Sequence, residues 1–233
     1  MTEALKEQAA ERALDLVADG MVLGLGTGST ARYVVLGLGR RLREGRLRDI
    51  VGVPTSEATA ALAREQGVPL ATLEQQPALD LAIDGADEID PQLHLIKGLG
   101  GALLREKVVA SVARRFVVVA DRSKLVAHLG ERAPLPVEVV AFALAPVQRR
   151  LTELGAMPVL RRAADGSPYH TDQGNPILDC RFARIDDPAA LDRAVRAIPG
   201  VVEHGLFLGL ASSAFVAGDH GVELLEADAP QRR

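Results

Sequence analysis

The chain has 233 residues, of which 48% are hydrophobic and 25% are charged, and this composition predicts a folded protein with a substantial core. A net charge of −4 and an aromatic content of 3% disfavour a protein that mainly binds nucleic acid, because such proteins present basic surfaces and stacking side chains. The single cysteine, Cys180, cannot form an intrachain disulfide, and no apolar run approaches the roughly 20 residues that span a bilayer. We therefore expect a cytoplasmic protein with neither a membrane nor a nucleic-acid partner.

The first half of the chain predicts alternating helices and strands, because apolar residues recur at helical spacing in some segments and form short continuous runs in others. In chain order, we expect a helix over 3–18, a strand at 21–25, a helix over 29–43, a strand at 50–53, a helix over 57–66, strands at 69–72 and 79–83, a helix over 101–114 and a strand at 116–120. Such alternation is typical of a parallel α/β sheet that helices cover on both faces.

The pattern changes after Lys124. We expect a strand at 135–140, a helix over 145–154, two strands that flank a turn at 171–175, a helix over 187–198 and strands at 201–208, 212–217 and 221–225. The order β-α-β-β-α-β indicates a small α+β module of the ferredoxin-like type. The predicted division is therefore a parallel-sheet domain of residues 1–128 plus 205–233 and an inserted domain of residues 129–204.

A glycine-rich loop, GLGTGST at residues 24–30, follows the first predicted strand and precedes a helix. Backbone N–H groups at a helix N-terminus bind anions, and the hydroxyls of Thr27, Ser29 and Thr30 add donors. A nucleoside-triphosphate loop would need a lysine after the glycines. Residues 26–31 match the dinucleotide fingerprint, but the second strand ends in VPTS and lacks the acid that would hold a ribose. A small phosphate ester is therefore the better ligand, and a tight turn with a helix cap is the alternative.

A second motif, DGADEID at residues 84–90, places four acids directly after a predicted strand. Open parallel sheets bind their ligands at this position, beyond the carboxyl ends of the strands. A divalent cation site is a weak interpretation, because the motif lacks EF-hand spacing and contains no His or Cys. A solvent-exposed turn is the other alternative to a functional acid cluster.

A third motif, KGLGGALLREK at residues 97–107, again leads from glycines into a predicted helix. On that helix Glu106 lies on an apolar stripe with Ala102, Leu103, Val109, Ala110 and Ala113. Burial on such a stripe favours a carboxylate that acts as a general base. The alternative is an exposed acid that pairs with Arg105 or Lys107.

Together, a phosphate-binding loop, a desolvated glutamate, a lysine and aspartates suit proton transfer between adjacent carbons of a sugar phosphate. A base removes the proton next to the carbonyl, while a cation and hydrogen-bond donors stabilise the enediolate oxygens. This chemistry needs no cofactor.

Seven motifs resemble type A ribose-5-phosphate isomerase in order and spacing: GLGTGST, TSEAT, DGADEID, IKGLGGALLREK, ADRSK, LPVEV and GNPILD. The resemblance covers essentially the whole chain. It implies interconversion of D-ribose 5-phosphate and D-ribulose 5-phosphate through a cis-enediolate, in the non-oxidative pentose phosphate pathway. It also implies a Rossmann-like domain with an inserted α+β domain, no cofactor and no metal, and a homodimer or tetramer.

The resemblance further implies roles for individual residues. Glu106 is expected to move the proton between C2 and C1, and Lys97 to support the developing oxyanion. Asp84, with Asp87 close by, is expected to assist proton movement at the sugar oxygens and ring opening. The implied substrate-binding residues are Thr27, Gly28, Ser29, Thr30, Asp84, Gly85, Ala86, Asp87, Lys97, Gly98, Leu99, Gly100 and Lys124, with the phosphate on residues 27–30 and Lys124.

The chain departs from the family at Leu99, where many members have a third glycine, and this side chain could alter the approach of the backbone to the sugar. Glu57 in TSEAT is given no catalytic role, and His94 is expected to be structural. Two other functions are weighed: another sugar-phosphate isomerase or lactonase, and a sugar-phosphate sensor that binds the sugar without chemistry. The sensor leaves Glu106 on its apolar stripe without a role.

Overall fold

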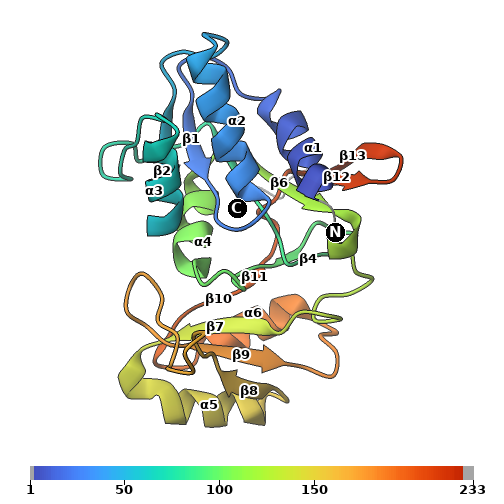
Figure 1. Cartoon of the computed structure of the whole chain (residues 1–233). Coiled ribbons are helices and arrows are strands. Elements are labelled where there is room, and N and C mark those ends of the chain that lie inside the picture. Colours follow the sequence, from blue (N-terminus) through green and yellow to red (C-terminus); the bar gives the residue numbers. More distant parts are fainter. Residues whose placement is uncertain (1–2, 228–233) are drawn as a thin grey trace. The chain divides into compact units, whose positions relative to one another are not determined.

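The computed structural model describes residues 3–227, which form two compact units. Figure 1 shows the chain coloured from its N-terminus to its C-terminus. The first unit contains residues 3–86, 105–125 and 209–227, and the second contains residues 87–104 and 126–208. The predicted division, with residues 129–204 as the inserted domain, stays a prediction. The compact units differ from it mainly because residues 87–104 belong to the second unit, where β-pairing holds them.

The first unit is built on a six-stranded sheet with the order β13-β12-β6-β3-β1-β2. Its strands are β1 (Val22–Leu25), β2 (Val51–Pro54), β3 (Leu81–Asp84), β6 (Phe116–Asp121), β12 (Ser213–Gly218) and β13 (Gly221–Glu226). Neighbouring strands are parallel except for β13, which pairs with β12 in a hairpin. The predicted Rossmann-like parallel sheet is therefore confirmed, with one antiparallel strand at its edge.

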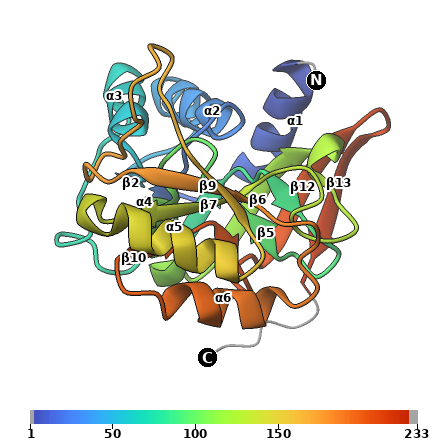
Figure 2. The same ribbon diagram turned by 90° about the horizontal axis from the view of Figure 1, so that it is seen from below.

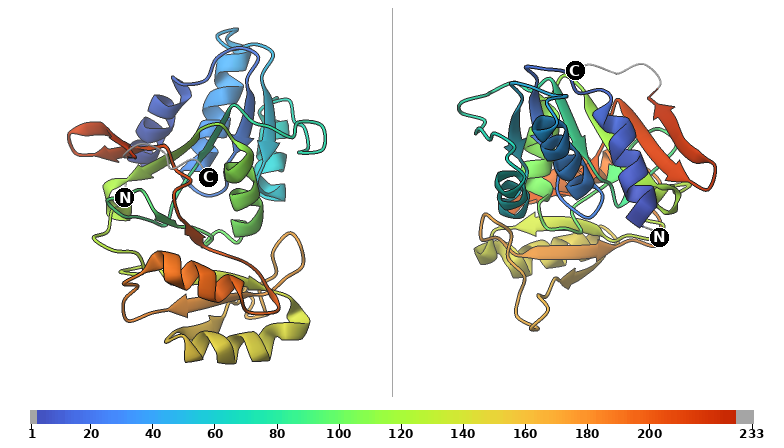
Figure 3. Two further views of the ribbon diagram at one scale, coloured as in Figure 1. Left: turned by 180° about the vertical axis from the view of Figure 1, so that it is seen from behind. Right: turned by 45° about the horizontal axis from the view of Figure 1, so that its top comes forward.

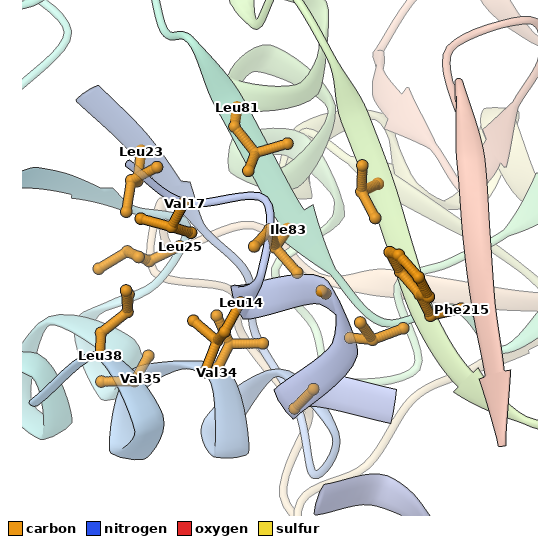
Figure 4. Close-up of a cluster of buried hydrophobic side chains, with 14 of the residues drawn as sticks. Leu14, Val17, Leu23, Leu25, Val34, Val35, Leu38, Leu81, Ile83 and Phe215 are labelled. Atoms are coloured by element: carbon orange, nitrogen blue, oxygen red, sulfur yellow. The ribbon is translucent and has the colours of Figure 1, made fainter. Parts of the chain in front are cut away.

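Helices α1 (Glu3–Leu14), α2 (Ala31–Arg43) and α3 (Glu57–Glu65) cover one face of this sheet. Side chains alternate between the two faces of a strand, so every second apolar residue of β1 and β3 faces these helices. Figure 4 shows the resulting cluster, which joins strand residues to α1 and α2 through Leu14, Leu23, Leu25, Val34, Val35, Leu38, Leu81 and Ile83. The burial of these side chains fixes the sheet under the helices.

Helix α4 (Leu103–Val112) contributes residues 105–112 to the first unit and lies on the opposite face of the sheet (Figure 3, left). The strand residues on that face are small. A Cβ on Gly24 of β1 would lie 2.5 Å from Val109 Cγ1 and 2.8 Å from the Cβ of Ala82 on β3. The glycine therefore allows α4, which carries Glu106, to approach the sheet closely.

The second unit contains a four-stranded antiparallel sheet with the order β10-β7-β9-β8. Its strands and helices are β7 (Leu135–Val139), the short η2 (Ala141–Ala143), α5 (Leu144–Glu153), β8 (Met157–Leu160), β9 (Ile177–Arg181), α6 (Pro188–Arg196) and β10 (Val201–His204). Figure 2 shows α5 and α6 on one side of β7 and β9, where Val147, Leu151 and Val195 enter the core. The predicted ferredoxin-like module is confirmed.

A smaller sheet in the same unit has the order β11-β5-β4. It consists of β4 (Glu88–Ile89), β5 (Leu95–Ile96) and β11 (Leu206–Phe207). Strands β4 and β5 form a hairpin whose turn is held by the Asp90 carboxylate, which accepts the N–H groups of Gln92 and His94. Two-residue strands show no periodicity, so this hairpin was not predicted.

Two predicted strands are wrong in extent. The strand expected at 69–72 is reduced to one parallel bridge between Leu70 and Gly52, since Pro69 has no N–H to extend the ladder. The strand expected at 201–208 is divided at Gly205 into β10 and β11, which belong to different sheets. A Cβ on Gly205 would lie 2.2 Å from the carbonyl oxygen of Lys97, so the backbones cross closely there.

Candidate active site

The glycine loop at residues 26–30 connects β1 to α2 in the first unit and is fixed against Asp84, the last residue of β3. The Oδ1 atom of Asp84 accepts the N–H groups of Thr27 at 3.0 Å and of Gly85 at 2.7 Å. A Cβ on Gly26 would lie 2.2 Å from this oxygen and 2.6 Å from the Cα of Asp84. Only glycine permits this approach, so the loop and the first acid of DGADEID are in direct contact.

The tip of this loop is open to solvent. Gly28 has a φ of 111°, which favours glycine, and both Gly28 and Ser29 are exposed. Thr30 precedes α2, but its hydroxyl makes no capping hydrogen bond. Thr30 therefore does not cap α2 through its side chain, and anion binding at the tip stays a prediction.

The hydroxyl of Thr27 is used to hold the loop. It lies 2.7 Å from the hydroxyl of Thr55, 2.8 Å from that of Ser56 and 3.2 Å from that of Thr59. The Thr59 hydroxyl also donates to the carbonyl oxygen of Gly26 at 2.9 Å. We call these four residues the hydroxyl cluster; contact of Thr27 with a substrate stays a prediction.

Three members of the hydroxyl cluster come from the motif TSEAT, which follows β2. Thr55, Ser56 and Thr59 are all buried. Strands β1 and β2 are parallel neighbours, so the residues that follow them lie at the same edge of the sheet. TSEAT therefore supports the glycine loop from the side, a role that was not predicted although adjacent parallel strands could have indicated it.

Glu106 lies in the first turn of α4 and is 4% exposed. Because α4 leads back to β6, which runs parallel to β3, its first turn lies toward the edge where β1 and β3 end. Val109, one turn later on the same side of the helix, packs against Gly24. The burial expected from the apolar stripe is confirmed, and the exposed-acid alternative is wrong.

The neighbour of Glu106 on α4 forms an ion pair with α3. Arg105 Nη1 lies 2.8 Å from Glu57 Oε1. This hydrogen bond lowers the pKa of the Glu57 carboxyl. Glu57, which has no predicted role, therefore helps to hold the helix that carries Glu106.

Lys124 ends a short helix, η1 (Arg122–Lys124), that directly follows β6. The buried Asp121 begins this turn by accepting the N–H group of Ser123 at 3.0 Å. Since β6 and β3 are parallel neighbours, the half-buried Lys124 follows the same sheet edge as Asp84. The first unit thus gathers the glycine loop, Asp84, Glu106 and Lys124 at one edge of its sheet.

Asp87 and Lys97 belong to the second unit, at the open end of the β4–β5 hairpin. Glu88 pairs with Ile96, and the N–H group of Asp87 donates to the carbonyl oxygen of Ile96 at 2.8 Å. Asp87 precedes β4 and Lys97 follows β5, so the two residues face each other across the hairpin. The structure therefore brings these two predicted site residues together, through a strand pairing that the sequence did not reveal.

The lysine itself is deeply buried. Lys97 is 2% exposed, and its Nζ lies 5.5 Å from the centre of the Phe207 ring. A cation over an aromatic face is stabilised by the ring quadrupole. Phe207 is in β11, so the division of the last strand at Gly205 helps to place this ring.

The loop after Lys97 is tied to Asp87. Asp87 Oδ2 accepts the N–H group of Leu99 at 2.9 Å, while the Leu99 side chain is 43% exposed. Gly98 has a φ of 103°. The leucine at this unusual position therefore leaves the backbone contact intact and points its side chain toward solvent.

The other acids of DGADEID support structure. Glu88 is 1% exposed and accepts three backbone N–H groups, from Gly130 and Arg132 at 2.6 Å and from Ala133 at 2.7 Å. Asp90 holds the hairpin turn. The solvent-exposed turn is therefore the wrong interpretation of this motif. Within residues 3–227, no group of three or more His, Cys, Asp or Glu side chains is placed to hold a metal ion, and independence from metals stays a prediction.

Two other candidate reactive groups have structural surroundings. His94 Nδ1 lies 3.3 Å from Asp90 Oδ2, and this contact raises the pKa of the imidazole. Cys180 is fully buried in the core of the second unit, and burial raises the pKa of its thiol to about 12. Both environments fit residues that stabilise the fold.

The sequence resembles known proteins over nearly its full length. A profile of the family described as Ribose 5-phosphate isomerase A (phosphoriboisomerase A) matches residues 51–221. The chain is 62% identical over 228 residues to ribose-5-phosphate isomerase A of Roseiflexus sp. (strain RS-1), which covers 98% of this chain and 97% of the relative. Ribose-5-phosphate isomerase A of Synechococcus sp. (strain JA-3-3Ab) is 54% identical over 222 residues, or 95% and 96% of the two chains.

Solved structures agree in fold. A D-ribose-5-phosphate isomerase in complex with phospho-erythronic acid has a TM-score of 0.95 and 44% identity, covering 97% of this chain and 99% of that chain. Ribose 5-phosphate isomerase A of Methanocaldococcus jannaschii has a TM-score of 0.93 and 44% identity, covering 97% and 100%.

Proposed function

Because the chain belongs to the ribose 5-phosphate isomerase A family, we propose that it interconverts D-ribose 5-phosphate and D-ribulose 5-phosphate in the non-oxidative pentose phosphate pathway. The observation that carries the proposal within this chain is the burial of Glu106, which is 4% exposed at the sheet edge that also holds the glycine loop and Asp84. A buried carboxylate at such an edge suits proton abstraction from carbon.

Glu106 is the proposed base. It takes the proton from C2 of the open-chain aldose; the electron pair forms the C1–C2 double bond, and O1 becomes the anionic oxygen of a cis-enediolate. A proton then moves from O2 to O1, and Glu106 returns its proton to C1, which leaves the ketone at C2. Exclusion of water keeps the transferred proton on the carboxylate between the two steps.

Lys97 and the two aspartates are proposed to act at the oxygens. The compact ammonium of Lys97, 2% exposed, stabilises the charge that develops on the enediolate. Asp84 is 3% exposed, and its orientation is fixed by two backbone N–H groups, which suits a carboxylate that opens the sugar ring and passes protons between oxygens. Asp87 assists from its place opposite Lys97 on the hairpin.

The phosphate is proposed to bind at the tip of the glycine loop and at Lys124. The exposed Gly28 and Ser29 lie at the start of α2, where the helix dipole favours an anion. Lys124 supplies a full positive charge from the end of η1. The contacts of Gly85, Ala86 and residues 98–100 with the sugar also belong to this proposal.

The decisive test follows ribose 5-phosphate in deuterated water by NMR, without added nucleotide and with a metal chelator present. We expect ribulose 5-phosphate to form, with deuterium at C1 unless the base shields the proton. Glu106→Gln should lower kcat by about 10²–10⁴-fold and leave substrate binding nearly unchanged, because the amide keeps the shape and loses the base. The matched control is Glu65→Gln, at an exposed position on α3, and its kcat should stay within about twofold of the wild-type value.

Four results would count against the proposal. An active Glu106→Gln variant would remove this residue as the base. Wild-type protein that binds the sugar phosphate without isomerising it would be a sensor. Turnover of another phosphorylated sugar or of a lactone in place of ribose 5-phosphate would assign a different reaction to the site. Loss of turnover with the chelator, restored by a divalent cation, would contradict metal independence.

We also propose that the protein works in the cytoplasm as a homodimer or tetramer, which rests on its resemblance to the family. No helix within residues 3–227 has the length and apolar character to cross a membrane. Light scattering after size exclusion gives the mass of the assembly directly. A mass equal to one chain of 24.7 kDa would contradict the proposed assembly.

A further inference from the structure

The hairpin of residues 161–176, which joins β8 to β9, contacts residues 97–101, the Lys97 loop, and all of these residues belong to the second unit. Arg161 Nη1 donates to the carbonyl oxygens of Gly98 at 2.9 Å and Leu99 at 3.1 Å. Its Nε donates to Asp179 Oδ2 at 2.9 Å, and its Nη2 donates to Asp179 Oδ1. The side chain of Arg161 is 11% exposed, so this two-pronged pair is largely shielded from water.

Tyr169 holds the same arginine from another side. The Arg161 Cζ lies 5.7 Å from the centre of the Tyr169 ring, and the N–H group of Tyr169 donates to the carbonyl oxygen of Arg161 at 2.9 Å. The ring also covers the end of the loop, because a Cβ on Gly101 would lie 2.0 Å from the Tyr169 hydroxyl oxygen. The guanidinium is therefore held in one orientation by a carboxylate and a ring.

One peptide group of the loop is bound at both ends. The carbonyl of Gly98 and the N–H of Leu99 belong to the same peptide bond and point in opposite directions in its trans form. Arg161 binds the oxygen, and Asp87 Oδ2 binds the nitrogen at 2.9 Å. The position of the Asp87 carboxylate is therefore linked to the arginine through a single rigid plane.

The next peptide group is oriented by the same contact. Since Arg161 binds the carbonyl oxygen of Leu99, the N–H group of Gly100 points away from the guanidinium, toward the side of the loop where Asp87 lies. Backbone N–H groups aimed at a developing oxyanion stabilise it. The arginine thus sets the direction of the donors that follow Lys97.

We propose that Arg161, held by Asp179, is a positioning residue for the isomerisation. This proposal rests on the proposed function and adds to it. Arg161 orients the Lys97 loop and Asp87 for the enediolate without touching the sugar. Arginine is required because its guanidinium binds Asp179 through Nε and Nη2 and both carbonyl oxygens through Nη1. The single ammonium of a lysine cannot make all of these contacts. The effect belongs to the transition state, since misplacement of stabilising groups slows chemistry more than it weakens binding.

The test measures kcat and KM for ribose 5-phosphate, the Kd of phospho-erythronic acid, and thermal unfolding. Arg161→Met should lower kcat about 10–100-fold and change KM less than about threefold. Affinity for phospho-erythronic acid, whose carboxylate mimics the two enediolate oxygens, should fall in proportion to kcat/KM. Arg161→Lys should recover part of the loss, and Asp179→Asn should show a smaller drop than Arg161→Met.

The matched control is the next residue, Arg162, which is exposed and donates to the Gly166 carbonyl oxygen at 2.8 Å within the hairpin. The kcat and KM of Arg162→Met should stay within about twofold of the wild-type values. A folded Arg161→Met variant with the kinetics of this control overturns the proposal. If Arg161→Met does not fold, the proposal fails when Arg161→Lys and Asp179→Asn fold and retain full kcat. Wild-type protein without turnover contradicts the proposed function itself, so the two failures are distinguishable.

Discussion

Two glycine loops carry most of the proposed substrate contacts, and the chain fixes them by different chemistry. The loop at residues 26–30 is held by the neutral hydroxyls of the hydroxyl cluster and by the N–H group of Thr27, which donates to Asp84 Oδ1. The loop at residues 97–101 is held by an ion pair, Arg161 with Asp179, and by the side chains of Asp87 and Tyr169. The first loop therefore depends mainly on neutral hydroxyls and on close backbone packing against Asp84, and the second depends on an arginine and two carboxylates.

This difference has consequences for the response to mutation and to pH. A backbone packed against backbone cannot yield to an added atom, whereas a flexible side chain can move aside. Hydroxyls do not titrate near neutral pH, whereas carboxylates lose their partners in acid. The first three predictions below test how the two loops are held, and the fourth tests a charged contact elsewhere in the second unit; they start with the largest expected effect.

Gly26→Ala should cause the largest loss. The new Cβ would lie 2.6 Å from the Cα of Asp84, so either the loop or β3 must shift. We expect kcat/KM to fall at least about 100-fold, because a displacement near 1 Å at a catalytic group has this effect. Gly218→Ala is the control, since its Cβ would meet only the exposed, flexible Arg122 side chain, and it should retain activity. Equal activity of the two variants would contradict the backbone argument.

Thr59→Val should have an intermediate effect. The substitution keeps the shape but removes the donor to the Gly26 carbonyl oxygen and a partner of Thr27 and Ser56. We expect a loss of about 1–3 kcal/mol in the free energy of unfolding and about a tenfold loss of kcat/KM. Thr152→Val removes an exposed hydroxyl that binds the Gln148 carbonyl within α5, and urea unfolding should show little change for it. If Thr59→Val leaves the free energy of unfolding and kcat/KM unchanged, the hydroxyl cluster does not hold the loop.

Gly101→Ala should be milder than Gly26→Ala. Its Cβ would collide with the Tyr169 side chain, 2.0 Å from the hydroxyl oxygen, and Gly101 has a φ of 81°. We expect backbone strain to lower the free energy of unfolding by about 1 kcal/mol, and kcat to decrease a few-fold. Combining it with Tyr169→Ala should relieve the collision, so the two losses should be less than additive. Strict additivity in kinetic assays would show that the ring does not press on the loop.

Acid should weaken the second unit through Asp192, the smallest effect of the four. Asp192 Oδ1 lies 3.2 Å from Nε2 of the buried His204, and this contact, with Arg196, lowers the Asp192 pKa from 3.8 to about 2. Because the folded value is depressed, the stabilisation is complete above pH 4 and is lost as the pH falls toward 2. After allowance for solvent screening, we expect the free energy of unfolding to fall by about 1 kcal/mol over this pH range. Asp192→Asn should reduce this part of the pH dependence in thermal melts without changing kcat at neutral pH; an unchanged acid response would contradict the assignment.

Much of the fold follows from local pattern. The continuous apolar runs of β3 and β6 and the β-α-β-β-α-β order of the second unit were predictable because periodicity and turn residues are properties of neighbouring residues. The hairpin that places Asp87 opposite Lys97 was not, since its strands have two residues each. The split at Gly205 depends on the backbone of Lys97, a residue from a different part of the chain.

The candidate site also has features that the sequence predicted and features that only the structure shows. Glu106 was recognisable because apolar positions surround it on one helix, and its burial agrees with that pattern. Leu99 raised a question that the sequence could not answer, and the structure shows its N–H group on Asp87 and its side chain exposed. Glu88 and Asp90 resembled their neighbours in DGADEID, and only their hydrogen bonds identify them as structural.

By itself, the sequence determined the fold class, the family and the motifs that supply the reacting groups, because each of these is written in contiguous residues. Tertiary structure alone decided how those groups are held. Thr27 meets Thr55 across 28 residues, and Arg161 meets Gly98 across 63, and no local spacing predicts such contacts. Side-chain partners are chosen by the packing of the folded chain, which places the supporting hydroxyls and the Arg161–Asp179 pair where the glycine loops need them.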